Sequence, residues 1–158
     1  VLALCWGFAV LIPWAAATGS LAGGWPLLLC WAATLCWTFG FDTVYAMSDR
    51  DDDRAVGVRS SALSLGARAP LAVGLCYGIT LVALAFAAAN AEVSWPFWPL
   101  WALAAAGMAR ETRLLQRAET NHLNGGDATS RGFYGRQFAG QVRLGGLLLL
   151  ALMLGKAG

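Results

Sequence analysis

The chain has 158 residues and a mass of 16.6 kDa, and 58% of its residues are hydrophobic while only 13% are charged. Soluble domains average about 45–50% apolar and about 25% charged residues, whereas the mean hydropathy here is +0.58. So few charged side chains make too thin a shell for a water-soluble domain of this size, and the net charge of +2 indicates no particular partner. The composition excludes most soluble classes and predicts an all-α, polytopic transmembrane helix bundle.

Five apolar segments, separated by polar or turn-rich breaks, are the predicted spanning helices. They are Val1 to about Thr18, Pro26 to about Met47, Ala69 to about Ala89, Pro96 to about Ala109 with a polar helical continuation over Arg110–Glu119, and a segment centred on Leu144–Leu154. Crossing the hydrocarbon core takes about 20 helical residues. The second and third segments are long enough, the first needs further residues before it, and the last two need helix in their arginine-bearing flanks.

The arginines lie in alternate breaks. Four occupy the break Ser48–Arg68 and six occupy the region from Arg110 to Arg143, while the breaks Gly19–Trp25 and Asn90–Trp95 contain no Lys or Arg. Five spans place alternate breaks on the same side of a membrane, and the positive-inside rule makes the arginine-bearing side cytoplasmic. The sequence therefore predicts an integral protein of a bacterial inner membrane, a plasma membrane or an equivalent, with its C-terminus outside.

Two other features agree with this orientation. Four tryptophans lie near the opposite ends of their spans, as in an interfacial aromatic belt: Trp14, Trp25, Trp95 and Trp98. The segment Asn121–Ser130, NHLNGGDATS, is predicted to be a flexible loop on the arginine-bearing side.

The segment Phe41–Leu63, FDTVYAMSDRDDDRAVGVRSSAL, carries five of the nine acidic residues. On a continuous helix, which turns about 100° per residue, Asp42, Asp49 and Asp53 point within about 20° of one direction. A divalent cation would offset the repulsion among three carboxylates, and oxygen-only ligands suit Mg²⁺ that shares its shell with a substrate phosphate. Asp51 points away and is predicted to be solvated. The pattern indicates a magnesium site that accepts a phosphorylated ligand.

Asp42 lies more than one turn inside the second predicted span, where a carboxylate usually faces a cavity or a partner. We favour such a functional position over a snorkelling carboxylate at the cytoplasmic rim. Two interpretations of Arg54 and Arg59 stay open, namely diphosphate binding through the guanidinium fork and the positive-inside distribution. For Arg50, Arg68 and the arginines after residue 109 we favour the second. The sequence contains no nucleic-acid-binding module, so no nucleic acid is expected as a partner.

The same segment resembles the second aspartate-rich signature of the UbiA superfamily of intramembrane prenyltransferases, and is most similar to its 4-hydroxybenzoate polyprenyltransferase branch. The branch pattern runs Asp-x-x-Tyr-Ala, then Asp-x-x-x-Asp, then Gly-x-(Lys/Arg)-Ser, and is matched by Asp42, Tyr45, Ala46, Asp49, Asp53, Gly57, Arg59 and Ser60. The resemblance implies the second half of a nine-helix bundle. Residues 1–158 would be the C-terminal part of one transmembrane prenyltransferase domain, with a cytoplasmic Asp-rich loop at 48–68.

The resemblance also implies an activity and roles for individual residues. The activity is Mg²⁺-dependent transfer of a polyprenyl group from polyprenyl diphosphate to the aromatic ring of 4-hydroxybenzoate, in ubiquinone or plastoquinone biosynthesis. Asp49 and Asp53 would bind Mg²⁺, with Asp42 as a further metal ligand or directly behind one. Arg54 and Arg59 would contact the diphosphate. The apolar spans would hold the prenyl tail within the lipid bilayer.

The family's first aspartate-rich motif, Asn-Asp-x-x-Asp-x-x-x-Asp, does not occur in these 158 residues. Because the chain also begins at Val1 inside an apolar run, we expect it to be a piece of a longer enzyme, or to need a partner chain that supplies that motif. Two other functions stay open. One is an inactive membrane subunit or pseudo-enzyme that packs against a partner. The other is a small transporter or channel piece, which is disfavoured because most carboxylates lie at one rim.

Overall fold

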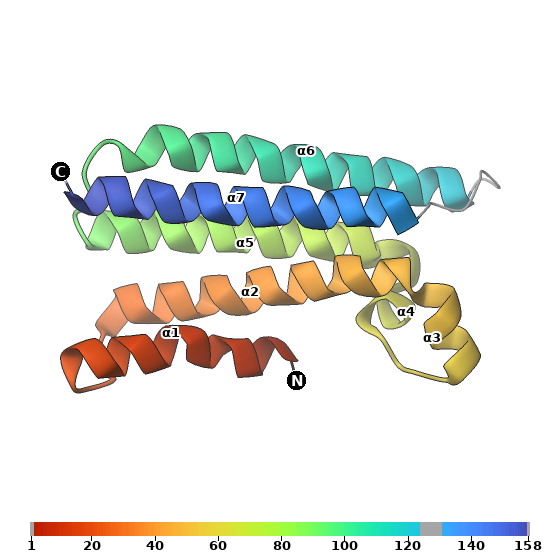
Figure 1. The fold of residues 1–158 in the computed structure, drawn as a ribbon, viewed down its shortest axis with the longest axis horizontal. Helices are drawn as coiled ribbons and strands as arrows, with labels where there is room; N and C mark the ends of the chain where they lie inside the picture. The colour runs from red at the N-terminus through yellow and green to blue at the C-terminus, as the bar shows by residue number, and fades with distance from the viewer. Residues whose placement is uncertain (1, 124–130, 158) are drawn as a thin grey trace.

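The computed structural model describes residues 2–123 and 131–157, and all regular secondary structure in these ranges is helical. The elements in chain order are α1 (Leu2–Thr18), α2 (Gly24–Ser48), α3 (Arg50–Val56), α4 (Ser61–Leu65), the short 3₁₀ helix η1 (Gly66–Arg68), α5 (Ala69–Asn90), α6 (Phe97–Leu123) and α7 (Arg131–Ala157). The five long helices lie side by side with similar axis directions (Figure 1). The prediction of an all-α bundle is confirmed.

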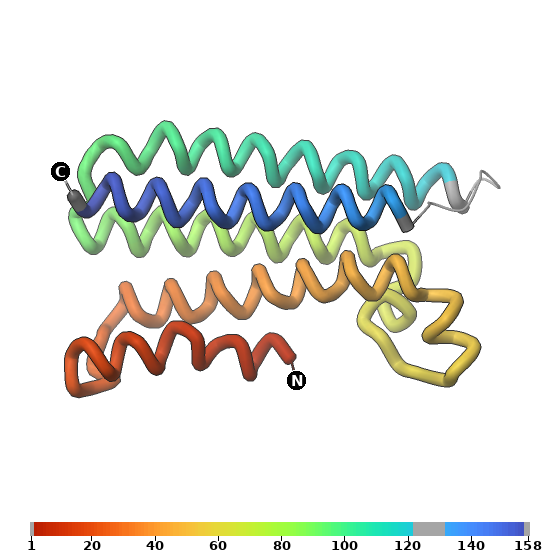
Figure 2. Tube along the Cα trace, viewed as in Figure 1, coloured from red at the N-terminus to blue at the C-terminus, as the bar shows by residue number. Residues whose placement is uncertain are grey.

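The connections between the long helices alternate between the two ends of the bundle. The turns α1–α2 and α5–α6 lie at one end together with the C-terminal end of α7, and the segment from α3 to η1 lies at the other (Figure 2). The end of α6 and the start of α7 also lie at the α3 end. The arginine-bearing breaks of the sequence therefore share one end of the bundle, which we call the polar end.

Three of the five predicted spans are long and apolar enough to cross a membrane: Gly24–Ser48, Ser61–Asn90 and Gly132–Lys156. The helix α1 is apolar but shorter, with 17 residues. The helix α6 has 27 residues, but charged side chains begin at Arg110, so its apolar part is only about 20 Å long at a rise of about 1.5 Å per residue. Helical structure does extend into the arginine-bearing flanks of α6 and α7, as the last two predicted spans require.

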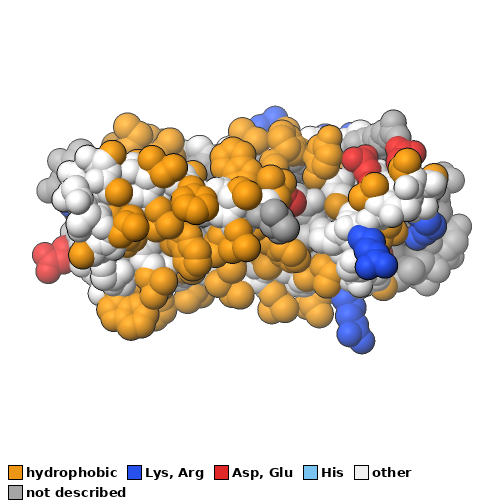
Figure 3. All heavy atoms as spheres, turned by 90° about the horizontal axis from the view of Figure 1, so that it is seen from below, with side chains coloured by type: hydrophobic (Ala, Val, Ile, Leu, Met, Phe, Trp, Pro, Cys, Tyr) orange, Lys and Arg blue, Asp and Glu red, His pale blue; other side chains and the backbone are white. Residues whose placement is uncertain are grey.

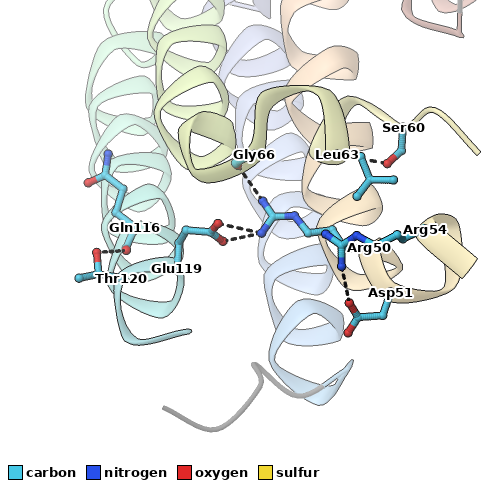
Figure 4. A network of polar contacts seen from close by, with 9 residues as sticks. All are labelled: Arg50, Asp51, Arg54, Ser60, Leu63, Gly66, Gln116, Glu119 and Thr120. Carbon is cyan, nitrogen blue, oxygen red and sulfur yellow. Dashed lines mark hydrogen bonds and ion pairs between the residues drawn. The ribbon is translucent and has the colours of Figure 1, made fainter. Parts of the chain in front are cut away.

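The predicted loop at 121–130 is shorter than expected at its start. Asn121 is still helical, because α6 continues to Leu123. The remainder of the predicted loop, residues 124–130, lies outside the described residues. The three residues 121–123 add less than one turn to α6, whose C-terminal part lies beside the segment from α3 to η1 (Figure 4).

Small residues and buried hydrogen bonds bring α2 and α5 together. A Cβ atom on Gly40 would lie 2.7 Å from a ring carbon of Tyr77, so only glycine permits this approach. The Thr80 hydroxyl donates a hydrogen bond to the backbone carbonyl of Ala33 at 3.1 Å, across the same helix pair. Close packing of this kind holds helices together where lipid removes the hydrophobic drive. The segment from α3 to η1 at the polar end is attached to this helix pair, because it connects the end of α2 to the start of α5.

The outer surface divides into an apolar middle and a charged end. Hydrophobic side chains cover the middle of the face that includes α1, and charged side chains gather at the polar end (Figure 3). Large apolar side chains on α1 are exposed, among them Trp6, Phe8 and Ile12. An apolar band of this extent is unusual on a soluble monomer and is expected on a protein surrounded by lipid.

Candidate active site

The aspartate-rich segment is not one continuous helix. The helix α2 ends at Ser48, Asp49 has φ −109° and ψ 12° at the junction, and α3 begins at Arg50. The Ser48 hydroxyl donates to Asp49 Oδ1 at 2.9 Å, a local side-chain contact that competes with regular helix. The prediction that Asp42, Asp49 and Asp53 share one face of a continuous helix is therefore wrong. The rotation of about 100° per residue applies only within one helix, and Asp42 lies in a different helix from Asp53.

The spacing between Asp49 and Asp53 survives the break. The backbone N–H of Asp53 donates to the Asp49 carbonyl at 2.8 Å, so the two residues are one helical turn apart at the start of α3. Both side chains are partly buried. This turn is the part of the predicted site that the structure brings together, and we call it the Asp49–Asp53 turn.

Asp42 is separated from this turn by more than one turn of α2. It is partly buried and lines a hollow of about 340 Å³ whose other lining residues are Trp6, Trp37, Thr38 and Phe41. A carboxylate at the wall of a hollow within a span agrees with the expectation that it faces a cavity. The hollow lies between α1 and α2, on the side of the exposed α1 surface.

The predicted diphosphate ligands Arg54 and Arg59 are both exposed. Arg54 Nη1 lies 3.2 Å from Asp51 Oδ1, and the Asp51 side chain is 90% exposed, which confirms the prediction that Asp51 is solvated. An exposed ion pair of this kind contributes little to stability and exchanges readily with solvent. The guanidinium of Arg54 is therefore available to an anion that approaches the polar end.

Arg50 behaves differently from the other arginines of the segment. Its Nη1 donates to both carboxylate oxygens of Glu119, at 2.8 and 2.9 Å, and its Nη2 donates to the Gly66 carbonyl at 3.1 Å (Figure 4). The side chains of Arg50 and Glu119 are only 15% and 6% exposed. From the sequence we favoured the positive-inside explanation for Arg50 and did not single out Glu119, because no local pattern connects residues that are 69 positions apart.

Two residues of the sequence motif shape the chain after α3. Gly57 has φ +76°, a left-handed conformation that favours glycine, and its N–H donates to the Asp53 carbonyl. The Ser60 side chain caps α4 by accepting from the Leu63 backbone N–H at 3.4 Å. The Thr43 hydroxyl then donates to Ser61 Oγ at 3.0 Å, which connects α4 to α2. These contacts give the glycine and the serine of the motif a structural role in the chain itself.

A second cavity of about 310 Å³ lies between α2 and α7, beside the polar end. Its lining residues are mostly aromatic or small: Phe41, Val44, Tyr45, Ser48, Tyr134, Gly135, Phe138 and Gln141. The Oε1 atom of Gln141 is buried and has no hydrogen-bond partner among the described residues. Ser48 connects this cavity to the Asp49–Asp53 turn through its bond to Asp49. The cavity was not predicted from the sequence, although a glutamine within an apolar helix is a signal that could have indicated it.

The described residues supply only part of a metal-ligand set. Within residues 2–123 and 131–157, no three His, Cys, Asp or Glu side chains gather into a set that could hold a metal ion. Asp49 and Asp53 offer the oxygen donors that Mg²⁺ prefers, but by themselves they do not form a full site. The described residues therefore do not fit a complete magnesium centre.

The helical bundle, its three span-capable helices and the polar site at one end define an integral membrane protein. Residues 1–124 match the model of the UbiA prenyltransferase family. The chain therefore belongs to the UbiA prenyltransferase family, which confirms the resemblance seen in the aspartate-rich segment.

Several curated relatives of the chain are named as 4-hydroxybenzoate prenyltransferases. The chain is 55% identical over 82 residues to a 4-hydroxybenzoate solanesyltransferase of Synechocystis sp.. The aligned residues cover 51% of this chain and 27% of the relative. It is 40% identical over 97 residues to a 4-hydroxybenzoate octaprenyltransferase of Methylobacillus flagellatus, covering 61% and 32%. A Serratia proteamaculans 4-hydroxybenzoate octaprenyltransferase is 33% identical over 150 residues, covering 94% of this chain and 49% of the relative.

The lengths of these matches limit how much of the relatives the chain represents. The chain spans at most about half the length of the curated relatives it matches. No solved structure shows a significant match to it.

Proposed function

We propose that the protein transfers a polyprenyl group from polyprenyl diphosphate to the aromatic ring of 4-hydroxybenzoate, in the biosynthesis of a quinone such as ubiquinone or plastoquinone. The family membership and the activities named for its relatives support this assignment. The observation within the chain that carries it is the Asp49–Asp53 turn, which lies at the polar end of an apolar bundle beside two exposed arginines and an aromatic cavity.

The proposed reaction exchanges a C–O bond for a C–C bond. The bond between the allylic carbon and the diphosphate oxygen breaks, and the diphosphate leaves with the electron pair. The allylic carbon then bonds to the ring carbon ortho to the phenol hydroxyl, and that ring carbon loses its proton, which the released diphosphate or water takes up. Arg54 and Arg59 would bind the departing diphosphate, because a guanidinium fork matches phosphate oxygens. The apolar helix walls would exclude the water that otherwise captures an allylic cation.

We further propose Mg²⁺ as the cofactor, with Asp49 and Asp53 as ligands and Asp42 as a further ligand or directly behind one. Bound Mg²⁺ would supply positive charge against the diphosphate. Because the described residues do not complete a metal site, the remaining ligands would come from outside these 158 residues, in an N-terminal half of the enzyme or in a partner chain that carries the first aspartate-rich motif.

We place the polar end on the cytoplasmic side of a bacterial inner membrane or its equivalent. The support is the positive-inside rule, since the breaks at the opposite end contain no Lys or Arg. A cysteine introduced at Arg59 should react with a membrane-impermeant maleimide only in inverted vesicles, and one introduced at Glu92 only in right-side-out vesicles. The reverse labelling pattern would contradict this orientation.

The activity is tested in membranes that contain the protein expressed from its complete open reading frame. Radiolabelled 4-hydroxybenzoate, polyprenyl diphosphate and Mg²⁺ should give a lipid-soluble product. The variants Asp49→Asn and Asp53→Asn should lose at least about a hundredfold in rate while the protein still inserts, since charge stabilisation commonly makes the greatest contribution to such reactions. The matched control is Asp51→Asn, the same residue type on the same helix at an exposed position, which should retain activity. Full activity in both site variants would refute the residue assignment.

An inactive membrane subunit is the second candidate function. The observation that favours it is the incomplete metal-ligand set of the described residues. The intact mass of the endogenously expressed protein separates the two candidates. A mass near 16.6 kDa without prenyl transfer, alone or with co-purified membrane proteins, would favour the subunit. A mass near twice that value, with activity, would favour the enzyme.

A further inference from the structure

One arginine of the aspartate-rich segment reaches away from the site. Arg50 lies next to Asp49, at the start of α3, yet its guanidinium is turned toward α6 and η1 (Figure 4). There it donates to both oxygens of Glu119 and to the carbonyl of Gly66. A single side chain thus connects three elements, and we call these contacts the Arg50 anchor.

The burial of the anchor makes the pairing obligatory. Glu119 is 6% exposed and Arg50 is 15% exposed, so both charges are largely removed from water. A charge in such surroundings is tolerated when it is paired and hydrogen-bonded. The contacts engage both oxygens of Glu119 and both terminal nitrogens of Arg50. Arg50 is therefore committed to this contact, whereas Arg54 is not.

Apolar packing does not hold α3 in place. None of its seven residues is buried, so it has no side chain enclosed in the core. A helix this short is unstable in water without tertiary support. The Ser48–Asp49 contact and the Gly57 turn are local and do not reach α6. The Arg50 anchor connects α3 directly to α6.

We propose that Glu119 is a positioning residue for the aspartate site: by binding Arg50 it fixes the Asp49–Asp53 turn relative to α6 without touching substrate. This inference rests on the proposed prenyl transfer for its effect on activity. Its structural part, the immobilisation of α3, can be measured without any turnover. Glu119 thereby fixes the position of α3, a polar helix that has no buried side chain of its own.

The first test compares Glu119→Gln with wild type in the protein expressed from its complete open reading frame. Glutamine keeps the shape of the side chain but removes its charge and replaces one of the two acceptor oxygens with a donor NH₂ group, so at most one of the two bonds from Arg50 Nη1 is kept. Hydrogen exchange of residues 50–57 should become at least about tenfold faster, while exchange in α5 stays unchanged. The kcat for prenyl transfer should fall at least about tenfold, and KM for 4-hydroxybenzoate should change little. The matched control is Arg110→Gln, which removes an exposed arginine paired with Glu111 on the same helix and should leave both measurements at wild-type values.

A second variant tests whether Glu119→Gln acts only through a general loss of folded structure. In Arg50→Met combined with Glu119→Leu, both charges are replaced by apolar side chains of similar size, which usually preserves folding. The double variant should keep the unfolding temperature close to that of wild type, yet show fast exchange in α3 and reduced kcat. Wild-type exchange and activity in this variant would overturn the proposal, because packing alone would then position α3.

The outcomes also separate the inference from the proposed function. If wild type shows no prenyl transfer but Glu119→Gln still accelerates exchange only in residues 50–57, the proposed function fails and the anchor stands. If wild type is active and Glu119→Gln changes neither exchange nor kcat, the anchor fails and the proposed function stands. Loss of activity with unchanged exchange in α3 would also refute the positioning role.

Discussion

Replacing Gly40 with alanine should weaken the contact between α2 and α5. A Cβ atom at this position would lie 2.7 Å from Cε1 of Tyr77, whereas ordinary contacts begin at 3.4 Å, so the ring or the helix must move by about 0.7 Å. Tyr77 is only 2% exposed, so its ring is enclosed by neighbouring side chains. Overpacking a core costs about 1–3 kcal/mol, and alanine returns about 1 kcal/mol through its higher helix propensity. We expect a net loss of up to about 2 kcal/mol relative to wild type, which is about 1–3 kcal/mol relative to an alanine placed at an unobstructed helical glycine.

The measurement is denaturant-induced unfolding of the purified protein in detergent micelles. Gly78→Ala is the matched control, because this glycine is exposed on α5 and a Cβ there meets nothing within 4 Å. The control should leave stability unchanged or raise it by up to about 1 kcal/mol. Gly40→Ala combined with Tyr77→Leu should cost less than the sum of the two single substitutions, since the shorter side chain makes room for the added methyl group. If Gly40→Ala is as stable as the Gly78→Ala control, the close approach of the two helices is refuted.

Three further substitutions test other parts of the structure. Gly57→Ala should destabilise the turn after α3 by about 1–2 kcal/mol, because the φ of Gly57 is +76°, in the left-handed region. Hydrogen exchange at residues 53–58 should then become faster. Unchanged exchange would contradict the left-handed conformation of Gly57. Thr80→Val removes the bond to the neighbouring helix and should cost about 0.6 kcal/mol in the same unfolding assay, whereas Thr34→Val, whose hydroxyl bonds within its own helix, should cost less. If prenyl transfer is the activity, Arg59→Gln should raise KM for polyprenyl diphosphate several-fold more than Arg68→Gln does, and equal effects would argue against a diphosphate contact.

The long helices could be predicted from the sequence because length and apolar content are local properties. The segment predicted from Ala69 to about Ala89 is the helix Ala69–Asn90, and the one predicted from Pro26 to about Met47 lies inside α2. The alternation of arginine-rich breaks likewise depends only on the order of the spans. The arrangement of the apolar helices therefore follows from patterns that can be read along the chain.

The conformation of the aspartate-rich segment was harder to predict from the sequence, because it depends on contacts with residues that are distant in the chain. Helical periodicity placed three aspartates on one face, but the helix ends at Ser48 and separates Asp42 from the Asp49–Asp53 turn. The signal for that break, a serine followed by an aspartate, is weak because the same pair also occurs at helix starts. Glu119 could not be found at all from local patterns, since its partner lies on another element.

The arginines of the polar end show that the topological and the functional interpretations are not alternatives. If the polar end is cytoplasmic, as we propose, a positive charge there satisfies the positive-inside rule whatever its contacts are. Glu119 neutralises Arg50 internally, so that arginine contributes position to α3 but no free charge to an incoming anion. Arg54 and Arg59 carry the same charge but are exposed, so they remain able to bind phosphate oxygens. In the orientation that we propose, the distribution of arginines would orient the chain, and burial decides which of them are available to bind an anion.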